Sequence, residues 1–322
     1  MYKRFIICLI LFIAVGEVMI RIDDNIESNR IIKIPLGLRE TPEYNMLKEN
    51  KINLTGNNLR ILVIGDSYIA GGGINPKDRF SQKLKSICKT NNNGFDDVIV
   101  LDVSQANANT LDNNQTYFQF VDRFKPHFVI IGYNLDDIMG NLDKQKEKIE
   151  TGITPHEEET NSHVNESLIQ KIYYLYQKSR FLGFTLRELH SELKVHGIVI
   201  PNSIFDVTMK SYLENKENWQ KSKLLLQEVI EDAKIKNIQL IVLKLPELNL
   251  LEHKTLFVKP NQIIKDFFNQ FTSVIFINGD ELFNGENSKD YSLSKYDGHP
   301  NEKAHKKMAI EVSHYVGQYK GK

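Results

Sequence analysis

Residues 60–73, RILVIGDSYIAGGG, carry the pattern that decides the fold. The apolar run Ile61–Ile64 is typical of a strand buried on both faces, and it ends at Gly65 and Asp66, which favour a turn. Ser67 follows where a helix could begin. This order raises the question of whether Ser67 is a catalytic nucleophile or a member of an ordinary turn, because Gly, Asp and Ser are common in turns.

The rest of the chain alternates short apolar strands with amphipathic helices. Further strands are expected at 98–103, 127–131, 238–245 and 274–277, and helices at 78–87, 111–124, 212–236, 263–271 and 302–319. Crossover helices cover both faces of a parallel sheet. The pattern therefore predicts an α/β fold, a three-layer α/β/α sandwich with a parallel five-stranded sheet.

The composition is that of a folded protein with no overall charge bias. The chain of 322 residues is 41% hydrophobic and 25% charged, which is ordinary for a domain with a full core. Lys+Arg and Asp+Glu each number 41, so no basic field favours nucleic acid as a partner. Cys8 and Cys88 form neither a metal-ligand spacing nor a disulfide framework. We expect no cofactor and no bound metal.

The N-terminus carries a location signal. Lys3 and Arg4 precede the apolar run 5–16, FIICLILFIAVG, and the apolar character resumes after Glu17. Residues 1–20 are expected to be a membrane anchor or a signal peptide, and the continuation of the run favours an uncleaved anchor. An uncleaved anchor would hold the catalytic domain at the membrane, whereas cleavage of a signal peptide would make it secreted or periplasmic. Both place it outside the cytoplasm.

Two segments lie outside the strand and helix alternation. Residues 21–58 are Asn-rich with weak periodicity and are expected to form a stalk or linker with some helix. The domain is expected to span 59–322. Within it, the polar stretch 141–165 is followed by an aromatic-rich helical pattern at 168–193. We expect a helical insertion at about 141–210, forming a cap or lid over one end of the sheet.

Candidate catalytic residues follow the predicted strands. Ligands of parallel sheets bind at the carboxyl ends of the strands. Ser67 and Asn134 come directly after two of these strands, while Asp297 and His299 precede the last helix. A serine hydroxyl is activated by an imidazole that a carboxylate orients, and backbone N–H groups with an Asn amide can stabilise an oxyanion. Together, these residue types are those of a hydrolase that uses a serine nucleophile.

Three blocks carry a family resemblance. The segments GDSYIAGGGINPKDRFSQKL, GYNLDD and DGHPNEKAHKKMA, in this order, resemble the SGNH/GDSL hydrolase superfamily, in a membrane-anchored member of bacterial type. The resemblance spans about residues 59–319. It implies a flavodoxin-like α/β/α sandwich in which Ser67 is the nucleophile, His299 the base and Asp297 its partner. It also implies an oxyanion hole formed by the Ser67 N–H and the Asn134 amide.

The sequence departs from the family pattern at three points. The residue after Asn134 is a leucine where the family usually has an acid. The second block, SQANANT, lacks the usual Gly of the oxyanion hole, and Asn107 or a neighbouring residue is expected to hold its place, with Asn107 as the candidate donor. Asp297 lies two residues before His299, whereas a spacing of three is commoner. These departures weaken the expected oxyanion hole without abolishing it.

Several other residues have simpler interpretations. Asp66 is expected to cap the helix that begins at Ser67. His305 is expected to be a packed residue of the last helix, not a metal ligand. Gly71–Gly73 lack the Lys-Ser/Thr of a phosphate-binding loop and are expected to give flexible backbone beside the nucleophile. Tyr212 and Trp219 are expected to be structural.

Two functions of different classes remain open from the sequence. The first is an extracytoplasmic serine esterase that hydrolyses, or transfers, acyl or acetyl esters of an envelope carbohydrate or lipid. The second is a catalytically impaired accessory protein of the envelope that keeps the SGNH fold. The substrate, the choice between hydrolysis and transfer, and the oligomeric state are not determined by these residues.

Overall fold

The computed structural model describes residues 15–16, 18–19, 42–49, 54, 56–91, 94–140, 204–294 and 297–319. The chain divides into two compact units, one of residues 34–148 and 201–322, the other of residues 1–33 and 149–200. The elements below all belong to the first unit. Most of the predicted anchor and stalk, and residues 141–203 of the predicted insertion, lie outside the described residues. Across the residues that are described, no helix combines the length and the apolar character needed to cross a bilayer.

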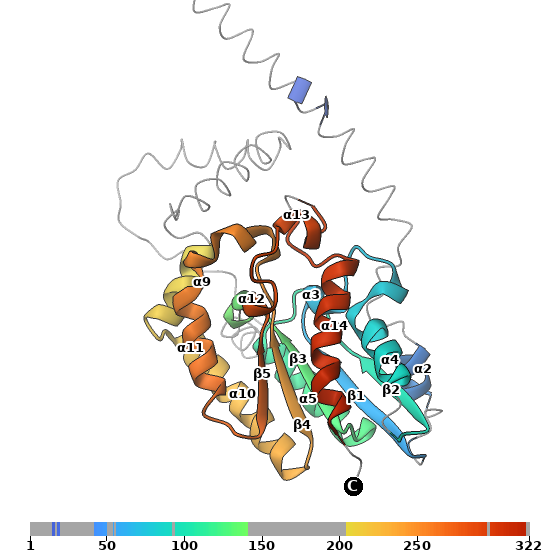
Figure 1. The fold of residues 1–322 in the computed structure, drawn as a ribbon. Helices are drawn as coiled ribbons and strands as arrows, with labels where there is room; N and C mark the ends of the chain where they lie inside the picture. Colours follow the sequence, from blue (N-terminus) through green and yellow to red (C-terminus); the bar gives the residue numbers. More distant parts are fainter. Residues whose placement is uncertain are drawn as a thin grey trace, which may run out of the picture. The chain divides into compact units, whose positions relative to one another are not determined.

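The core of the fold is a five-stranded sheet (Figure 1). The strands are β1 (Asn58–Ile64), β2 (Asp97–Asp102), β3 (Phe128–Tyr133), β4 (Gln239–Lys244) and β5 (Val274–Asn278). Their order is β2-β1-β3-β4-β5 and every neighbouring pair is parallel. This is the flavodoxin-like order, which brings a switch point to the carboxyl ends of β1 and β3. The predicted α/β fold with a parallel five-stranded sheet is confirmed.

Helices cover both faces of the sheet. The longer ones are α4 (Phe80–Thr90), α5 (Thr110–Phe124), α9 (Ile204–Leu213), α10 (Glu217–Ile235), α11 (Val258–Phe268) and α14 (Glu302–Gly317). The shorter ones are α2 (Pro42–Lys48), α3 (Ser67–Ala70), α12 (Gly279–Leu282) and α13 (Ser288–Tyr291), with the 3₁₀ turns η1 (Pro76–Asp78), η2 (Leu135–Ile138) and η3 (Leu248–Leu256). Helices α4 and α14 pack together on one face, and α5 packs with α10 on the other.

The central strands are apolar along their whole length because both faces are covered. Leu59, Ile61 and Val63 of β1 join one core cluster with side chains of α4 and α14. The intervening residues Leu62 and Ile64 point to the opposite face, since side chains alternate along a strand, and they are equally inaccessible to solvent. The continuous apolar run read from the sequence thus reflects burial on two sides.

The prediction of one continuous helix at 212–236 is wrong, because the structure has a break in this range between two helices. Helix α9 ends at Leu213 and α10 begins at Glu217. Between them Asn215 has a φ of 49°, in the left-handed region that an α-helix cannot continue through. Hydrophobic periodicity does not detect a single left-handed residue, so the sequence pattern joined the two helices into one.

Part of the segment predicted as a stalk packs on the sheet domain. In α2, Glu43 pairs with Lys85 of α4, and the carbonyl of Leu47 accepts a hydrogen bond from Arg123 of α5. The Leu47 side chain is buried. Residues 42–48 are therefore a helix anchored to the two helices that flank β1 and β2.

A buried ion pair holds the carboxyl end of β4. The side chain of Lys244 is 1% exposed and its Nζ lies 2.5 Å from Oδ2 of Asp280 in α12. The same oxygen accepts a hydrogen bond of 2.6 Å from Nδ2 of Asn261 in α11. One carboxylate thus connects β4, α11 and α12. Because a charge taken out of water is costly unless it is paired, Lys244 depends on Asp280.

This dependence gives a stability prediction. Asp280→Asn leaves the Lys244 charge uncompensated, so the free energy of unfolding is expected to fall by about 3–5 kcal/mol. The exposed pair Lys265–Glu281 serves as the control, and Glu281→Gln is expected to cost at most about 1 kcal/mol. Urea denaturation of both variants measures the difference. Equal losses in the two variants would contradict the proposed role of the buried pair.

Candidate active site

Ser67 stands at the carboxyl end of β1, where α3 begins. The turn is tight because Ile69 of α3 packs between Gly65, which directly follows β1, and Gly132 of β3. A Cβ on Gly65 would lie 2.4 Å from Cγ2 of Ile69, and one on Gly132 of β3 would lie 2.8 Å from its Cβ. Real Cβ atoms do not approach so closely, so both positions require glycine. Asp66 caps α3, as expected, by accepting a 2.9 Å hydrogen bond from the Tyr68 N–H.

The three predicted catalytic residues lie together in one hydrogen-bonded chain. Ser67 Oγ is 2.8 Å from Nε2 of His299, although 232 residues separate them in the sequence. Nδ1 of His299 is 2.6 Å from Oδ1 of Asp297. The carboxylate selects the tautomer with the proton on Nδ1, and Nε2 is then free to accept the Ser67 proton.

The two-residue spacing of Asp297 and His299 has a local explanation. The backbone N–H of His299 also donates to Oδ1 of Asp297, at 3.0 Å. One carboxylate oxygen therefore receives both the backbone and the ring N–H of the same histidine. The His299 carbonyl accepts a 2.9 Å hydrogen bond from Leu293, and Asn301 caps α14 directly afterwards. These bonds fix the loop that presents the imidazole to Ser67.

Charges around His299 favour its protonated form. Burial alone favours the neutral ring, but the hydrogen bond and charge of Asp297, with the charges of Asp66 and Asp136, raise the pKa of His299 above its ordinary 6.5. The hydrogen bond with His299 in turn holds the pKa of Asp297 below its ordinary value. The Tyr68 ring lies 4.4 Å from the His299 ring, centroid to centroid. The site thus stabilises an imidazolium, which is the species that forms when a serine is deprotonated.

Asn134 follows β3 and is held in one orientation. Its Oδ1 accepts a 2.7 Å hydrogen bond from the Leu135 N–H, while its Nδ2 faces Oδ2 of Asp66 at 3.4 Å. Its own N–H donates to Asp137 at 3.1 Å, which makes Asn134 and Asp137 a capping box for η2. The acid that caps this turn is therefore Asp137, three residues after Asn134, and the side chain of Leu135 is buried.

Asn107 adopts the conformation for which glycine is usually required. Its φ is 57°, in the left-handed region where Asn is the best tolerated residue after Gly. In the surrounding loop four backbone N–H groups donate hydrogen bonds within the protein, those of Ser104, Gln105, Ala108 and Asn109. The N–H groups of Ala106 and Asn107 donate to no atom of the residues that the structure describes. Asn107 therefore keeps the left-handed backbone that a glycine would adopt, and its N–H is not engaged by the described residues.

Three carboxylates gather beside Asn134. Asp66, Asp136 and Asp137 each offer an oxygen within 4.8 Å of the others. Burial, followed by the charge of Asp136, raises the pKa of Asp66 to about 7. Burial also raises the pKa of Asp137 well above its ordinary value. Asp66 and Asp137 already accept hydrogen bonds from backbone N–H groups, and an acidic cluster alone is no indication of a metal site.

Two contacts of the site were not predicted. Tyr68 lies against the His299 ring, and its position next to Ser67 in the sequence could have indicated this contact. Asn249 of η3 lies next to the catalytic loop, since a Cβ on Gly298 would be 2.9 Å from its Oδ1. The loop after β4 thus belongs to the site, as the rule that chemistry follows the carboxyl ends of strands would have suggested.

The remaining candidates are structural, as expected. His305 is fully buried, its Nδ1 accepts a 3.1 Å hydrogen bond from the Phe80 N–H, and burial lowers its pKa to about 3. The hydroxyl of Tyr212 donates to the Leu135 carbonyl at 2.9 Å, and its ring packs on Trp219. Tyr212 therefore supports the turn that carries Asn134.

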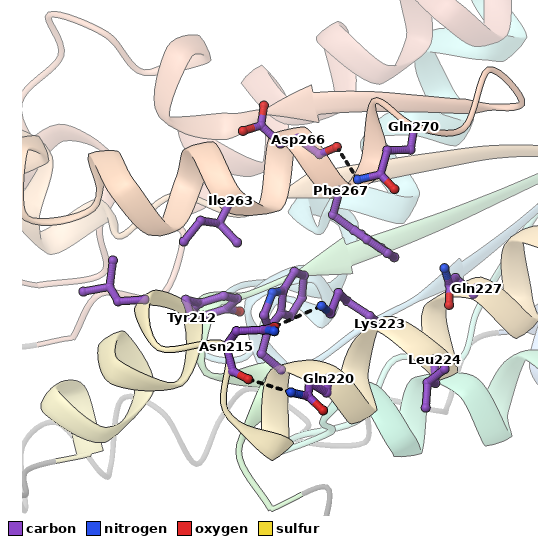
Figure 2. A pocket seen from close by; sticks show the side chains of 12 residues that line it. Tyr212, Asn215, Gln220, Lys223, Leu224, Gln227, Ile263, Asp266, Phe267 and Gln270 are labelled. Atoms are coloured by element: carbon purple, nitrogen blue, oxygen red, sulfur yellow. Dashed lines mark hydrogen bonds between the residues drawn. The ribbon is translucent and has the colours of Figure 1, made fainter.

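A separate groove of about 750 Å³ lies between α9, α10 and α11 (Figure 2). Its lining includes Trp219 and Phe267, and the polar side chains of Gln220 and Lys223 turn toward Asn215, to which they donate hydrogen bonds. None of the catalytic candidates lines this groove.

Comparisons with known proteins give likenesses of fold. No protein-family model and no curated protein matches the chain. The solved structures that it resembles include lipases, esterases and related acylhydrolases, some of them described as G-D-S-L or GDSL-like.

Three of these structures illustrate the degree of similarity. A lipase from a goat rumen metagenome, Lip_vut3, shares 12% identity with a TM-score of 0.48, over 81% of this chain and 98% of its own. Axe2, an acetyl-xylooligosaccharide esterase from Geobacillus, shares 12% with a TM-score of 0.45, over 81% and 94%. A G-D-S-L family protein described as lipolytic, from Desulfitobacterium hafniense, shares 13% with a TM-score of 0.43, over 80% and 99%.

The His299 environment gives a pH prediction. In an NMR titration the pKa of His299 is expected above 6.5, so the ring is still partly protonated where a free histidine is neutral. Asp297→Asn removes the charge that favours the imidazolium, and the pKa is expected to fall by about 1–3. His127, whose pKa burial lowers to about 4 at the opposite end of the sheet, is the internal control and should not move. An unchanged pKa of His299 in Asp297→Asn would contradict the assigned pairing.

Proposed function

We propose that this protein is a serine esterase of the SGNH/GDSL type. The observation that carries the proposal is the hydrogen-bonded chain from Ser67 Oγ through the His299 ring to Asp297, at the carboxyl edge of the parallel sheet. A nucleophile, a base and a carboxylate that orients the base are the groups that ester hydrolysis by covalent catalysis requires.

The geometry supports a two-step reaction. Ser67 Oγ attacks the ester carbonyl carbon while Nε2 of His299 takes its proton, giving a tetrahedral oxyanion and an imidazolium that Asp297 stabilises. The imidazolium then protonates the leaving alcohol, the ester C–O bond breaks and an acyl-Ser67 remains. A water, deprotonated by His299, releases the carboxylic acid and restores Ser67.

Three donors are proposed for the oxyanion. The Ser67 N–H stands in the first turn of α3, where helix N–H groups have no partner within the helix. Nδ2 of Asn134 keeps one hydrogen beyond the one that faces Asp66, and the Asn107 N–H is available. Such preorganised donors each contribute about 10²–10³-fold in rate.

The proposed substrate is an acyl ester, acetyl in the first place, of an envelope carbohydrate or lipid. The support is the apolar segment within residues 1–20, which we propose places the catalytic domain outside the cytoplasm and against the membrane, where such esters occur. Transfer of the acyl group to a sugar hydroxyl uses the same acyl-Ser67, with the hydroxyl replacing water.

The alternative of a catalytically impaired accessory protein has less support. It was motivated by the missing glycine of the second block and the altered block after β3. Asn107 adopts the left-handed conformation, and Asn134 is held by its cap, so neither departure removes a candidate donor.

Ser67→Ala is expected to lower kcat for p-nitrophenyl acetate by about 10⁴-fold or more, because the nucleophile is lost. The same substitution should abolish covalent labelling by a fluorophosphonate. Ser86→Ala, which removes an exposed hydroxyl of α4, is the matched control and should keep wild-type activity. A wild-type protein that is neither active nor labelled would identify the impaired alternative, and full activity of Ser67→Ala would contradict the assigned nucleophile.

The location is tested by fractionation of the full-length chain expressed in a bacterial host. We expect it in the membrane fraction, released by detergent and accessible to an externally added protease. Deletion of residues 2–20 should leave the protein soluble in the cytoplasm, and N-terminal sequencing of the wild type distinguishes an anchor from a cleaved signal. A full-length chain in the soluble cytoplasmic fraction would contradict the proposal.

A further inference from the structure

Asp66 makes two contacts, and only one of them is explained by capping. Its Oδ1 accepts the Tyr68 N–H at 2.9 Å and so caps α3. Its Oδ2 faces Nδ2 of Asn134 at 3.4 Å, across from β1 to β3. The side chain is 6% exposed. Capping alone does not require an acid here, because Ser and Asn cap helices about as well as Asp without carrying a charge into a buried site.

The contact between Asp66 and Nδ2 of Asn134 affects the orientation of the Asn134 side-chain amide. Its oxygen is committed to the Leu135 N–H at 2.7 Å, which places the NH₂ group on the side of Asp66. An NH₂ group has two hydrogens. When one of them is held by Asp66, the other has a fixed direction, as an oxyanion donor requires.

We propose that Asp66 is a positioning residue that aims the second N–H of Asn134 at the oxyanion and couples it to the turn carrying Ser67. This inference rests on the proposed esterase function. Asp66 makes no contact with the reacting atoms and is not itself a catalytic residue. The 3.4 Å separation fits this role, since catalytic hydrogen bonds are often long without substrate and tighten in the transition state.

The chemistry of the position distinguishes Asp from its nearest replacements. Both contacts of Asp66 are with N–H donors, so the residue must offer two acceptors. In Asp66→Asn, the new NH₂ group would point either at the Tyr68 N–H or at the Asn134 NH₂ group. Two hydrogen-bond donors would then face each other. A Ser can still cap α3 but has no second oxygen for Asn134.

Asp66→Ser therefore separates capping from positioning. Its kcat for p-nitrophenyl acetate is expected to fall about 10–100-fold with little change in KM, because an oxyanion donor is misaligned only in the transition state. Its melting temperature should stay near wild type. Asp66→Asn should lose a similar factor in kcat. Asn278→Ser, which exchanges the cap of α12, is the matched control and should keep wild-type kcat.

The decisive measurement is the same substitution in an Asn134→Ala background. If Asp66 acts through Asn134, Asp66→Ser should lower kcat less than about twofold further there. A loss of equal size in both backgrounds, or wild-type kcat in Asp66→Ser, would overturn the inference. Either result leaves the proposed function standing as long as Ser67→Ala is inactive. A wild-type chain that lacks both esterase activity and fluorophosphonate labelling would overturn the proposed function and this inference with it.

Discussion

The packing of Ile69 between Gly65 and Gly132 is the constraint on which the site depends. It presses α3 onto the ends of β1 and β3, the two strands at which the sheet order reverses. Ser67 and Asn134 extend from these same strand ends, so their separation is set by backbone that cannot move apart without opening the core. A larger residue at either glycine would displace the nucleophile and the amide together.

The opposite half of the site is assembled from the C-terminal part of the chain. His299 reaches Ser67 from a loop tied to α13 and α14, which joins α4 in covering one face of the sheet. The charges of Asp297, Asp66 and Asp136 favour the positively charged imidazole, whereas the donors proposed for the oxyanion are the N–H groups of Ser67 and Asn107 and the side-chain amide of Asn134. In the proposed reaction, the carboxyl edge would therefore stabilise both the imidazolium and the oxyanion that form when Ser67 attacks.

The sequence predicted those features that repeat or that use a residue type with one chemical role. Buried strands were read from apolar runs, and the triad from Ser, Asp and His at strand ends and a helix start. Features that depend on the backbone angle of a single residue could not be predicted from the sequence. Asn215 ends a helix through a left-handed φ, and nothing in the side-chain pattern distinguishes it from other asparagines. The sequence placed Asn107 where the resembling family has a glycine, but it did not show that the residue adopts a left-handed φ. The second contact of Asp66 was missed because it crosses between two strands.

The loop that joins Asp297, Gly298 and His299 has one further property. Because a single carboxylate oxygen holds both the backbone and the ring N–H of His299, the geometry of the acid and the base is set within three residues. It does not depend on the sheet for its internal order. A displacement of this loop would therefore separate the His299 ring from Ser67 while leaving the pair of Asp297 and His299 intact, so the two hydrogen bonds of the proposed triad differ in what they depend on.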